Sequence, residues 1–252
     1  MSRNRFFGGN WKMNHGSSAT ENYLQHFVNF AFPQSCEVVL FTPFTSLHLM
    51  QKYLGSTPIS YGAQNFYFEP SGAYTGEVSI QMLQDLGCTH VLTGHSERRE
   101  LFGESDEMVR RKTVVALEAG LTPMVCVGET LEERQQGETQ TKIQKQVRAV
   151  LEGMTASEAS NLLFAYEPIW AIGTGVNASE NDAREGVSTV RNVLKSLYND
   201  NLAEGIQIVY GGSVKSANIA SYMREEGIDG GLVGGASLNA PDFFQLIQNG
   251  TM

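Results

Sequence analysis

The chain has 252 residues, of which 41% are hydrophobic and 18% charged, and its 18 Lys and Arg against 27 Asp and Glu give a formal net charge of -9. This length suits one large domain or two small ones, and it is enough to bury about three quarters of the unfolded surface. The acidic balance, without a stripe of clustered Lys and Arg, argues against a nucleic-acid-binding protein.

The cysteines indicate the compartment. Cys36, Cys88 and Cys126 are too few and too widely spaced for a disulfide framework, which excludes a disulfide-stabilised secreted scaffold and predicts a reducing, cytoplasmic setting. The first apolar run, at residues 6–7, is too short for a signal-peptide core, and no later run approaches the ~20 residues of a membrane span. We therefore expect a soluble protein that is neither exported nor inserted into a membrane.

Eight short runs rich in apolar and β-branched residues predict strands. Taken along the chain, they lie at residues 6–11, 38–41, 59–64, 90–94, 122–127, 162–166, 206–210 and 230–234. Every interval between them has room for a helix, and apolar residues recur with helical spacing in several intervals. Residues typical of helix starts are Ser105, Ser179 and Pro241, and glycines that suit helix ends are Gly87, Gly120 and Gly227.

The predicted strands begin about every 32 residues, which is the length of one strand-loop-helix-loop unit. Strands that alternate with helices pair in parallel through right-handed crossovers. Eight units fill the chain, so the sequence predicts the α/β class and a single (β/α)8 barrel domain over residues 1–252. An open doubly wound sheet is the alternative, but its three spaced glycines after the first strand are absent.

In such a barrel the active site lies where the strands end. The first predicted strand runs into Asn10 and Lys12, and from position alone Lys12 is most simply a solvated surface cation. The fourth runs into His95 and then a predicted helix start, where the helix dipole disfavours the imidazolium and favours a neutral, donating ring. A structural histidine is the alternative, and Glu97 with the arginines after it fits an ordinary ion-pair network.

The sixth predicted strand ends at Glu167, ahead of an apolar loop. Loss of water around a carboxylate makes it a stronger proton acceptor, so this position suits a general base. The loop combines a stiff start, a large apolar body and terminal glycines, which is the composition of a lid, although a buried connecting loop is the alternative. The predicted lid residues are Pro168, Ile169, Trp170, Ala171, Ile172, Gly173, Thr174 and Gly175.

Two glycine pairs follow the seventh and eighth predicted strands, at residues 211–212 and 234–235. Glycines let backbone N–H groups approach a ligand closely, and N–H groups at a helix start bind phosphate. Phosphate sites in (β/α)8 barrels commonly occupy these two loops. The sequence therefore predicts a phosphate-binding site, with Lys12 as the nearest candidate cation.

With these positions assembled, the sequence resembles the triosephosphate isomerase family from residue 8 to residue 238. The motifs that carry the resemblance are residues 9–14, 72–77, 94–99, 126–129, 165–175, 210–214 and 232–238. The resemblance implies a TIM barrel that interconverts D-glyceraldehyde 3-phosphate and dihydroxyacetone phosphate through an enediol, in glycolysis and gluconeogenesis. It implies neither a metal nor an organic cofactor.

The resemblance also implies residue roles. Glu167 would move a proton between neighbouring carbons, while neutral His95 polarises the carbonyl and moves protons between the oxygens. Lys12 would offset negative charge on the oxyanion and the phosphate, Asn10 would add a donor, and Glu97 would orient the site through Lys12. The backbone N–H groups expected to hold the phosphate are those of Gly173, Ser213, Gly234 and Gly235.

The segment 72–77 and two single residues extend the comparison. The resemblance implies a homodimer in which this segment reaches into the partner subunit, with Thr75 near the partner's catalytic residues; from the residues alone, a surface loop is the simpler interpretation. Val176 stands where the family often has a basic residue. Gly231 stands where a large apolar residue is common, and we hypothesise that this glycine either lowers stability or is compensated by a neighbouring residue.

Two other functions compete with the isomerase. A phosphate-binding barrel such as an aldolase or a sugar-phosphate epimerase needs a Schiff-base lysine on a central strand or a metal-binding set, and neither is evident. The remaining histidines, at positions 15, 26, 48 and 90, show no ligand spacing. A non-catalytic binding or surface-adhesion role, alone or in addition, is the second alternative, because a fold does not fix a function.

Overall fold

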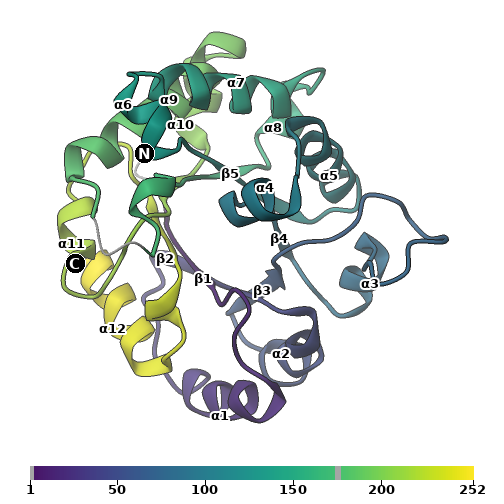
Figure 1. The fold of residues 1–252 in the computed structure, drawn as a ribbon. Coiled ribbons are helices and arrows are strands. Elements are labelled where there is room, and N and C mark those ends of the chain that lie inside the picture. The colour runs from purple at the N-terminus through teal and green to yellow at the C-terminus, as the bar shows by residue number, and fades with distance from the viewer. Residues whose placement is uncertain (1–2, 174–176) are drawn as a thin grey trace.

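The computed structural model describes residues 3–173 and 177–252, and its centre is a closed barrel of parallel strands in chain order. Figure 1 shows these strands surrounded by helices. The strands are β1 (Arg5–Asn10), β2 (Cys36–Thr42), β3 (Ser60–Ala63), β4 (His90–Thr93), β5 (Thr122–Val127), β6 (Leu163–Tyr166), β7 (Ile208–Tyr210) and β8 (Gly230–Val233). The barrel closes where β1 pairs with β8, so the predicted (β/α)8 fold is confirmed.

All eight predicted strands are present. The largest displacements are at β2, which begins two residues before the predicted run, and at β7, which begins two residues after it. Both faces of these strands are buried, as is usual in parallel sheets, and this is why the sequence reads as apolar runs without alternation.

Helices cover the outside of the barrel, with at least one between each pair of successive strands. They are α1 (Ser17–Phe27), α2 (Leu47–Leu54), α3 (Ile80–Asp85), α4 (Ser96–Phe102), α5 (Asp106–Glu118), α6 (Leu131–Gln135), α7 (Thr139–Leu151), α8 (Ala156–Ala159), α9 (Glu180–Leu197), α10 (Asp200–Gly205), α11 (Ile219–Tyr222) and α12 (Ala240–Thr251), with short 3-10 helices η1 (Phe44–Ser46), η2 (Ile169–Ala171) and η3 (Gly235–Ser237). Within the described ranges, no helix has the length and apolar character needed to cross a bilayer.

The helix ends follow local chemistry. Ser105 and Ser179 cap α5 and α9 as predicted, because each side chain accepts a hydrogen bond from a backbone N–H of the first turn. Gly87 and Gly120 directly follow the C-caps of α3 and α5 with left-handed φ values of 73° and 75°. Gly227 is also left-handed, but it lies in a turn beyond the end of α11, so its assignment as a helix end was wrong.

One further helix start differs slightly from the prediction. Pro241 is the second residue of α12 and follows Ala240, whereas the sequence placed it first. The cap is Asn239, whose side chain accepts from the Asp242 N–H. A proline is tolerated at either position because neither N–H has a partner within the helix.

Two apolar layers hold the barrel together. Successive side chains of a strand point to opposite faces, so Phe6 of β1 enters the barrel interior while Phe7 packs against the helices. The interior layer comprises Phe6, Val39, Phe41, Leu92, Met124, Cys126, Leu163, Ala165, Val209 and Leu232. This filled interior forms the floor of the site above it.

Neighbouring glycines of β8 have opposite packing requirements. A Cβ on Gly230 would lie 1.7 Å from the Phe6 carbonyl oxygen, so this position demands glycine. A Cβ on Gly231 would lie 3.6 Å from Val233 Cγ2 and 3.7 Å from Ile219 Cδ1, which are ordinary contact distances. The folded structure therefore has room for a side chain at position 231, and the glycine there only adds backbone freedom to the unfolded chain.

We predict that Gly231→Ala raises the free energy of unfolding by about 0.5–1 kcal/mol, because alanine restricts the unfolded chain and fits the folded one. Urea denaturation would show a higher midpoint at unchanged slope. Gly230→Ala is the matched control and should lower the midpoint strongly. A midpoint for Gly231→Ala at or below that of the wild type would contradict the hypothesis.

Candidate active site

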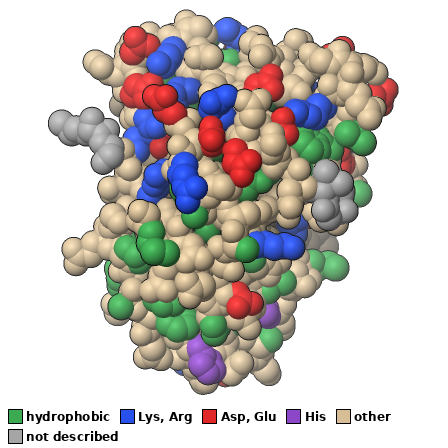
Figure 2. Space-filling view, turned by 90° about the vertical axis from the view of Figure 1, so that its left-hand side faces the viewer, with side chains coloured by type: hydrophobic (Ala, Val, Ile, Leu, Met, Phe, Trp, Pro, Cys, Tyr) green, Lys and Arg blue, Asp and Glu red, His purple; other side chains and the backbone are tan. Residues whose placement is uncertain are grey.

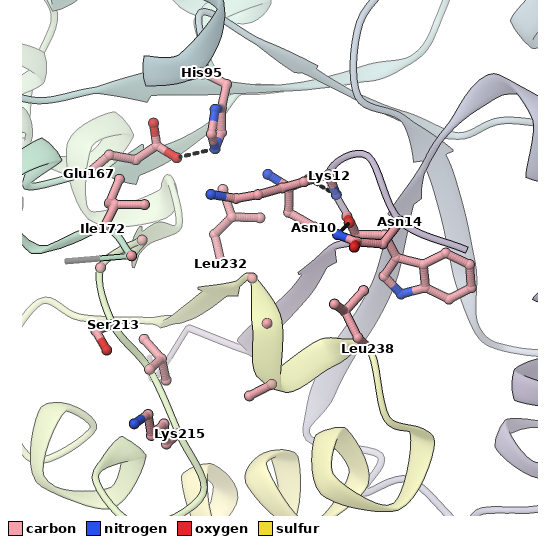
Figure 3. Close-up of a pocket in the computed structure, with 18 of the residues that line it drawn as sticks. Asn10, Lys12, Asn14, His95, Glu167, Ile172, Ser213, Lys215, Leu232 and Leu238 are labelled. Atoms are coloured by element: carbon pink, nitrogen blue, oxygen red, sulfur yellow. Dashed lines mark hydrogen bonds and ion pairs between the residues drawn. The ribbon is translucent and has the colours of Figure 1, made fainter. Parts of the chain in front are cut away.

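A cavity of about 600 Å³ opens at the carboxyl ends of the strands. It collects residues that follow β1, β4, β6, β7 and β8, which are far apart in the sequence but adjacent at one rim of the barrel (Figure 3). The residues singled out from the sequence that line it are Asn10, Lys12, His95, Glu167, Ile172, Gly173, Ser213, Gly234 and Gly235. Glu97 is outside this lining and reaches it through Lys12.

Glu167 follows β6 directly and is only 2% exposed. Its Oε2 accepts a hydrogen bond of 3.0 Å from the Ser96 backbone N–H, and its Oε1 lies 3.1 Å from His95 Nε2. Glycines that directly follow both neighbouring strands, β5 and β7, flank it: a Cβ on Gly128 would lie 1.8 Å from the Glu167 carbonyl oxygen, and one on Gly211 would lie 3.0 Å from its Cγ. The carboxylate is therefore held in a narrow, largely water-free position.

His95 is the N-cap residue of α4, as its predicted place at a helix start requires. Its Nδ1 accepts a hydrogen bond of 3.2 Å from the Glu97 backbone N–H, so that nitrogen presents a lone pair. A neutral imidazole has one protonated nitrogen, and here it must be Nε2. The ring thus directs its N–H toward Glu167 and the cavity (Figure 3).

Lys12 brings a cation to the cavity floor. Its Nζ lies 2.6 Å from Glu97 Oε1, so β1 and α4 are joined by an ion pair. Its backbone N–H donates to Asn10 Oδ1 over 3.1 Å. The backbone of Lys12 has a φ of 53°, which is left-handed and strained for a residue with a side chain.

The opposite wall of the cavity presents backbone donors. The loops after β7 and β8 bring Ser213, Gly234 and Gly235 to the cavity. In the part of the chain that the structure describes, no protein acceptor takes a hydrogen bond from the N–H groups of these three residues. Free N–H groups gathered around a cavity are typical of a phosphate site.

The first half of the predicted lid is anchored to a buried carboxylate. Glu129 is fully buried, and its Oε1 accepts hydrogen bonds from Trp170 Nε1 at 2.9 Å and from the Tyr166 hydroxyl at 3.1 Å. Burial raises the pKa of Glu129, although these bonds oppose the rise. Pro168 precedes η2, which covers Ile169 to Ala171. Thr174, Gly175 and Val176 lie outside the described residues.

Sequence reasoning missed several parts of this site. The Ser96 N–H that holds Glu167 belongs to the backbone, and no residue type signals it. Glu129 belongs to the motif at residues 126–129, but its role depends on Trp170, which is 41 residues away.

Among residues 3–173 and 177–252 no group of three His, Cys, Asp or Glu side chains is arranged to hold a metal ion.

A family model described as triosephosphate isomerase matches residues 5–250. The chain belongs to the triosephosphate isomerase family. It is 46% identical over 248 residues to the triosephosphate isomerase of Rubrobacter xylanophilus, covering 98% of this chain and 97% of that protein. It is 43% identical over 248 residues to that of Dictyoglomus thermophilum, covering 98% of this chain and the whole of that protein. The resemblance seen in the sequence is confirmed.

In this member of the triosephosphate isomerase family, we predict that the His95 ring carries its proton on Nε2 and a lone pair on Nδ1. Nitrogen-15 NMR should show one-bond N–H coupling at Nε2 and none at Nδ1. The exposed ring of His48 provides an internal reference with no fixed tautomer. A proton found on Nδ1, or on both nitrogens, would contradict the assignment.

Proposed function

We propose that this protein interconverts D-glyceraldehyde 3-phosphate and dihydroxyacetone phosphate through an enediol, a step of glycolysis and gluconeogenesis. The observation that carries the proposal is that a buried carboxylate, a neutral imidazole and a lysine share one cavity with a row of free backbone N–H groups. Membership of the triosephosphate isomerase family supports the same reaction.

Glu167 is the general base in this proposal. It removes a proton from one substrate carbon and returns it to the neighbouring carbon, and the electron pair moves into the carbonyl to form the enediol. Few waters compete for the carboxylate because it is buried, which supports this role. A positioned general base contributes roughly 10²–10⁴ in rate.

His95 and Lys12 act on the substrate oxygens. The Nε2–H of His95 polarises the carbonyl and passes a proton between the two oxygens, while Lys12 and Asn10 stabilise the developing negative charge. Glu97 keeps Lys12 in place through the 2.6 Å ion pair. One well-placed donor to an oxyanion is worth about 2.7–4 kcal/mol, so these residues and the base together supply much of the rate enhancement.

The phosphate lies against Gly173, Ser213, Gly234 and Gly235 in this proposal. The free N–H groups on the loops after β7 and β8 support that placement. Ile172 and Leu232 face the same cavity, and in this proposal closure of the predicted lid brings Ile172 toward Leu232 over the enediol. Exclusion of water suppresses loss of phosphate from this intermediate.

The proposed chemistry needs neither an organic cofactor nor a metal. One proton leaves a carbon and one returns, and the electrons are redistributed within the substrate, so no external oxidant or reductant takes part. The two alternative functions, a different phosphate-binding barrel enzyme and a non-catalytic protein, lack support from the geometry of the described residues. No observation in the described residues favours a non-catalytic binding or adhesion role.

We also infer that the protein acts as a homodimer. The chain between β3 and α3 projects from the barrel in Figure 1, and Thr75 in this segment is exposed. A second cavity of about 460 Å³ lies beside the active site and is lined by Met13, Glu97 and Phe102. Met13 is 97% exposed and Phe102 is 65% exposed. A partner's segment 72–77 in this cavity would cover both apolar side chains and reach Glu97.

A cytoplasmic location fits the state of the thiols. The three cysteines are free, and burial raises the pKa of Cys36 to about 11 and of Cys88 to about 12. Cys126 is fully buried beside Glu167, and burial raises its pKa well above the usual range. The thiols therefore stay protonated near neutral pH, which suits a protein in a reducing compartment. We also infer that the whole chain forms one barrel domain.

We predict that Glu167→Gln lowers kcat by at least about 10² with a smaller change in KM, because an amide cannot accept the carbon-bound proton. The measurement is isomerisation of D-glyceraldehyde 3-phosphate coupled to reduction of the product. Glu185→Gln, a change on the outside of α9, should leave kcat unchanged. The proposed function fails if wild type turns over no faster than Glu167→Gln.

We predict that Thr75→Arg converts the dimer to a monomer and lowers kcat at least about tenfold, because the partner's loop no longer supports the residues around Glu97. Size-exclusion chromatography over a dilution series, with activity measured on each fraction, tests both effects. Thr141→Arg places the same charge on exposed α7 as a control. A fully active wild-type monomer would disprove the dimer argument.

A further inference from the structure

The charges that face the active-site cavity nearly cancel. Its described lining includes two lysines, Lys12 and Lys215, and two carboxylates, Glu167 and Asp242. Lys12 is already paired with Glu97, so its charge is largely neutralised before a ligand arrives. A molecule with a net charge of -9 therefore offers a dianionic substrate little attraction at this opening unless another cation is free.

Lys215 is that cation. It lies on the loop after β7, two residues beyond Ser213, and both residues are labelled on the same stretch of chain in Figure 3. No ion pair or hydrogen bond joins its Nζ to any residue in the ranges 3–173 and 177–252, and its side chain is exposed. Asp242 lines the same cavity but is not within ion-pair distance of this amine.

The backbone of Lys215 is fixed although its amine is free. Its N–H donates to Asn218 Oδ1 over 2.8 Å, and its carbonyl oxygen accepts the N–H groups of Asn218 and Ile219 at 3.1 and 3.0 Å. These bonds anchor the root of the side chain to the start of α11. The charge is consequently kept near the cavity opening, whichever rotamer the long side chain adopts.

Lys145 also lacks a described ion pair, but it does not line the active-site cavity. Acidic and basic side chains are intermixed over the upper half of the face in Figure 2, and many of the described lysines and arginines are in ion pairs. A free amine beside unpaired backbone N–H groups is therefore a distinct electrostatic feature of the cavity wall.

We propose that Lys215 is a substrate-binding residue that attracts the phosphate dianion of the substrate to the N–H groups of Ser213, Gly234 and Gly235. This inference rests on the proposed isomerase function and adds a residue to its phosphate site. Lys215 acts on capture of the substrate and not on proton transfer, because the reacting carbons lie toward Glu167 and His95. Its effect belongs to kcat/KM and weakens as salt screens the attraction.

The test compares wild type with Lys215→Gln at ionic strengths of about 0.02 M and about 0.5 M. We expect the substitution to lower kcat/KM for D-glyceraldehyde 3-phosphate about three- to tenfold at low salt, with kcat within about twofold of wild type. The difference should nearly vanish at high salt. Lys215→Arg should retain the wild-type value because it keeps the charge.

Two controls separate a local effect from one of total charge. Lys145→Gln makes the same charge change at an exposed residue of α7 that has no described ion pair, and it should leave kcat/KM unchanged. Unphosphorylated D-glyceraldehyde, which lacks the dianion, should react equally with wild type and Lys215→Gln. Equal losses in both lysine variants, a loss that salt does not reduce, or a fall confined to kcat would overturn the inference.

Calorimetric titration with inorganic phosphate gives a readout that does not depend on turnover. Lys215→Gln should weaken phosphate binding at low salt by about the same factor as kcat/KM, whereas Lys145→Gln should not. If wild type isomerises the substrate and neither measurement separates the two variants, only the role of Lys215 is disproved. If wild type has no isomerase activity, the proposed function fails, and the phosphate titration alone decides whether Lys215 binds the anion.

Discussion

The Glu167 carboxylate contacts His95 and Ser96 at the start of α4, and the geometry of the cavity depends on this contact. The Ser96 N–H donates to one oxygen, and His95 Nε2 faces the other at 3.1 Å. The contact spans the barrel mouth from β6 to β4. Gly128, which follows β5, permits a close approach to the Glu167 backbone, since a Cβ there would lie 1.8 Å from the Glu167 carbonyl oxygen. The Glu167 carboxylate, the His95 ring and the start of α4 are therefore positioned together.

The same contact describes a resting state. In the proposed reaction, the Glu167 carboxylate exchanges its hydrogen bond from the Ser96 N–H for a contact with a substrate carbon. The hydrogen bond is worth about 1 kcal/mol net, which is small beside the contribution of a general base. In the proposed function, contacts formed with a bound substrate offset the loss of this bond, so the resting contact is compatible with efficient proton transfer.

Much of the architecture could be predicted because it depends on local sequence patterns, such as apolar runs and helix-capping residues. Apolar runs and their period of about 32 residues give the strands, the helix-bearing intervals and the closed barrel. The serine caps of α5 and α9 were equally local. The prediction that Gly227 ends a helix was wrong because a glycine with positive φ occurs in turns as well as at helix ends. Once the barrel is known, residues at strand ends must share one rim, which is why Lys12, His95 and Glu167 could be grouped.

The finer arrangement of the site could not be read in that way. The tautomer of His95 depends on one backbone N–H, and the anchoring of Trp170 depends on Glu129 in another loop. The packing space beside Gly231 depends on Ile219, which belongs to the preceding helix. These contacts join segments far apart in the chain at tenths of an ångström, and a pattern of residue types carries no such distances.

The left-handed backbone of Lys12 is unfavourable for a residue with a side chain, although this position carries a charged group at the cavity. A residue with a side chain is destabilised by about 1 kcal/mol in this conformation relative to glycine. The conformation also sets the direction in which the side chain leaves β1, toward Glu97 and the cavity. A glycine at position 12 would relieve this local strain, but it would also remove the amine that joins Glu97 at the edge of the cavity.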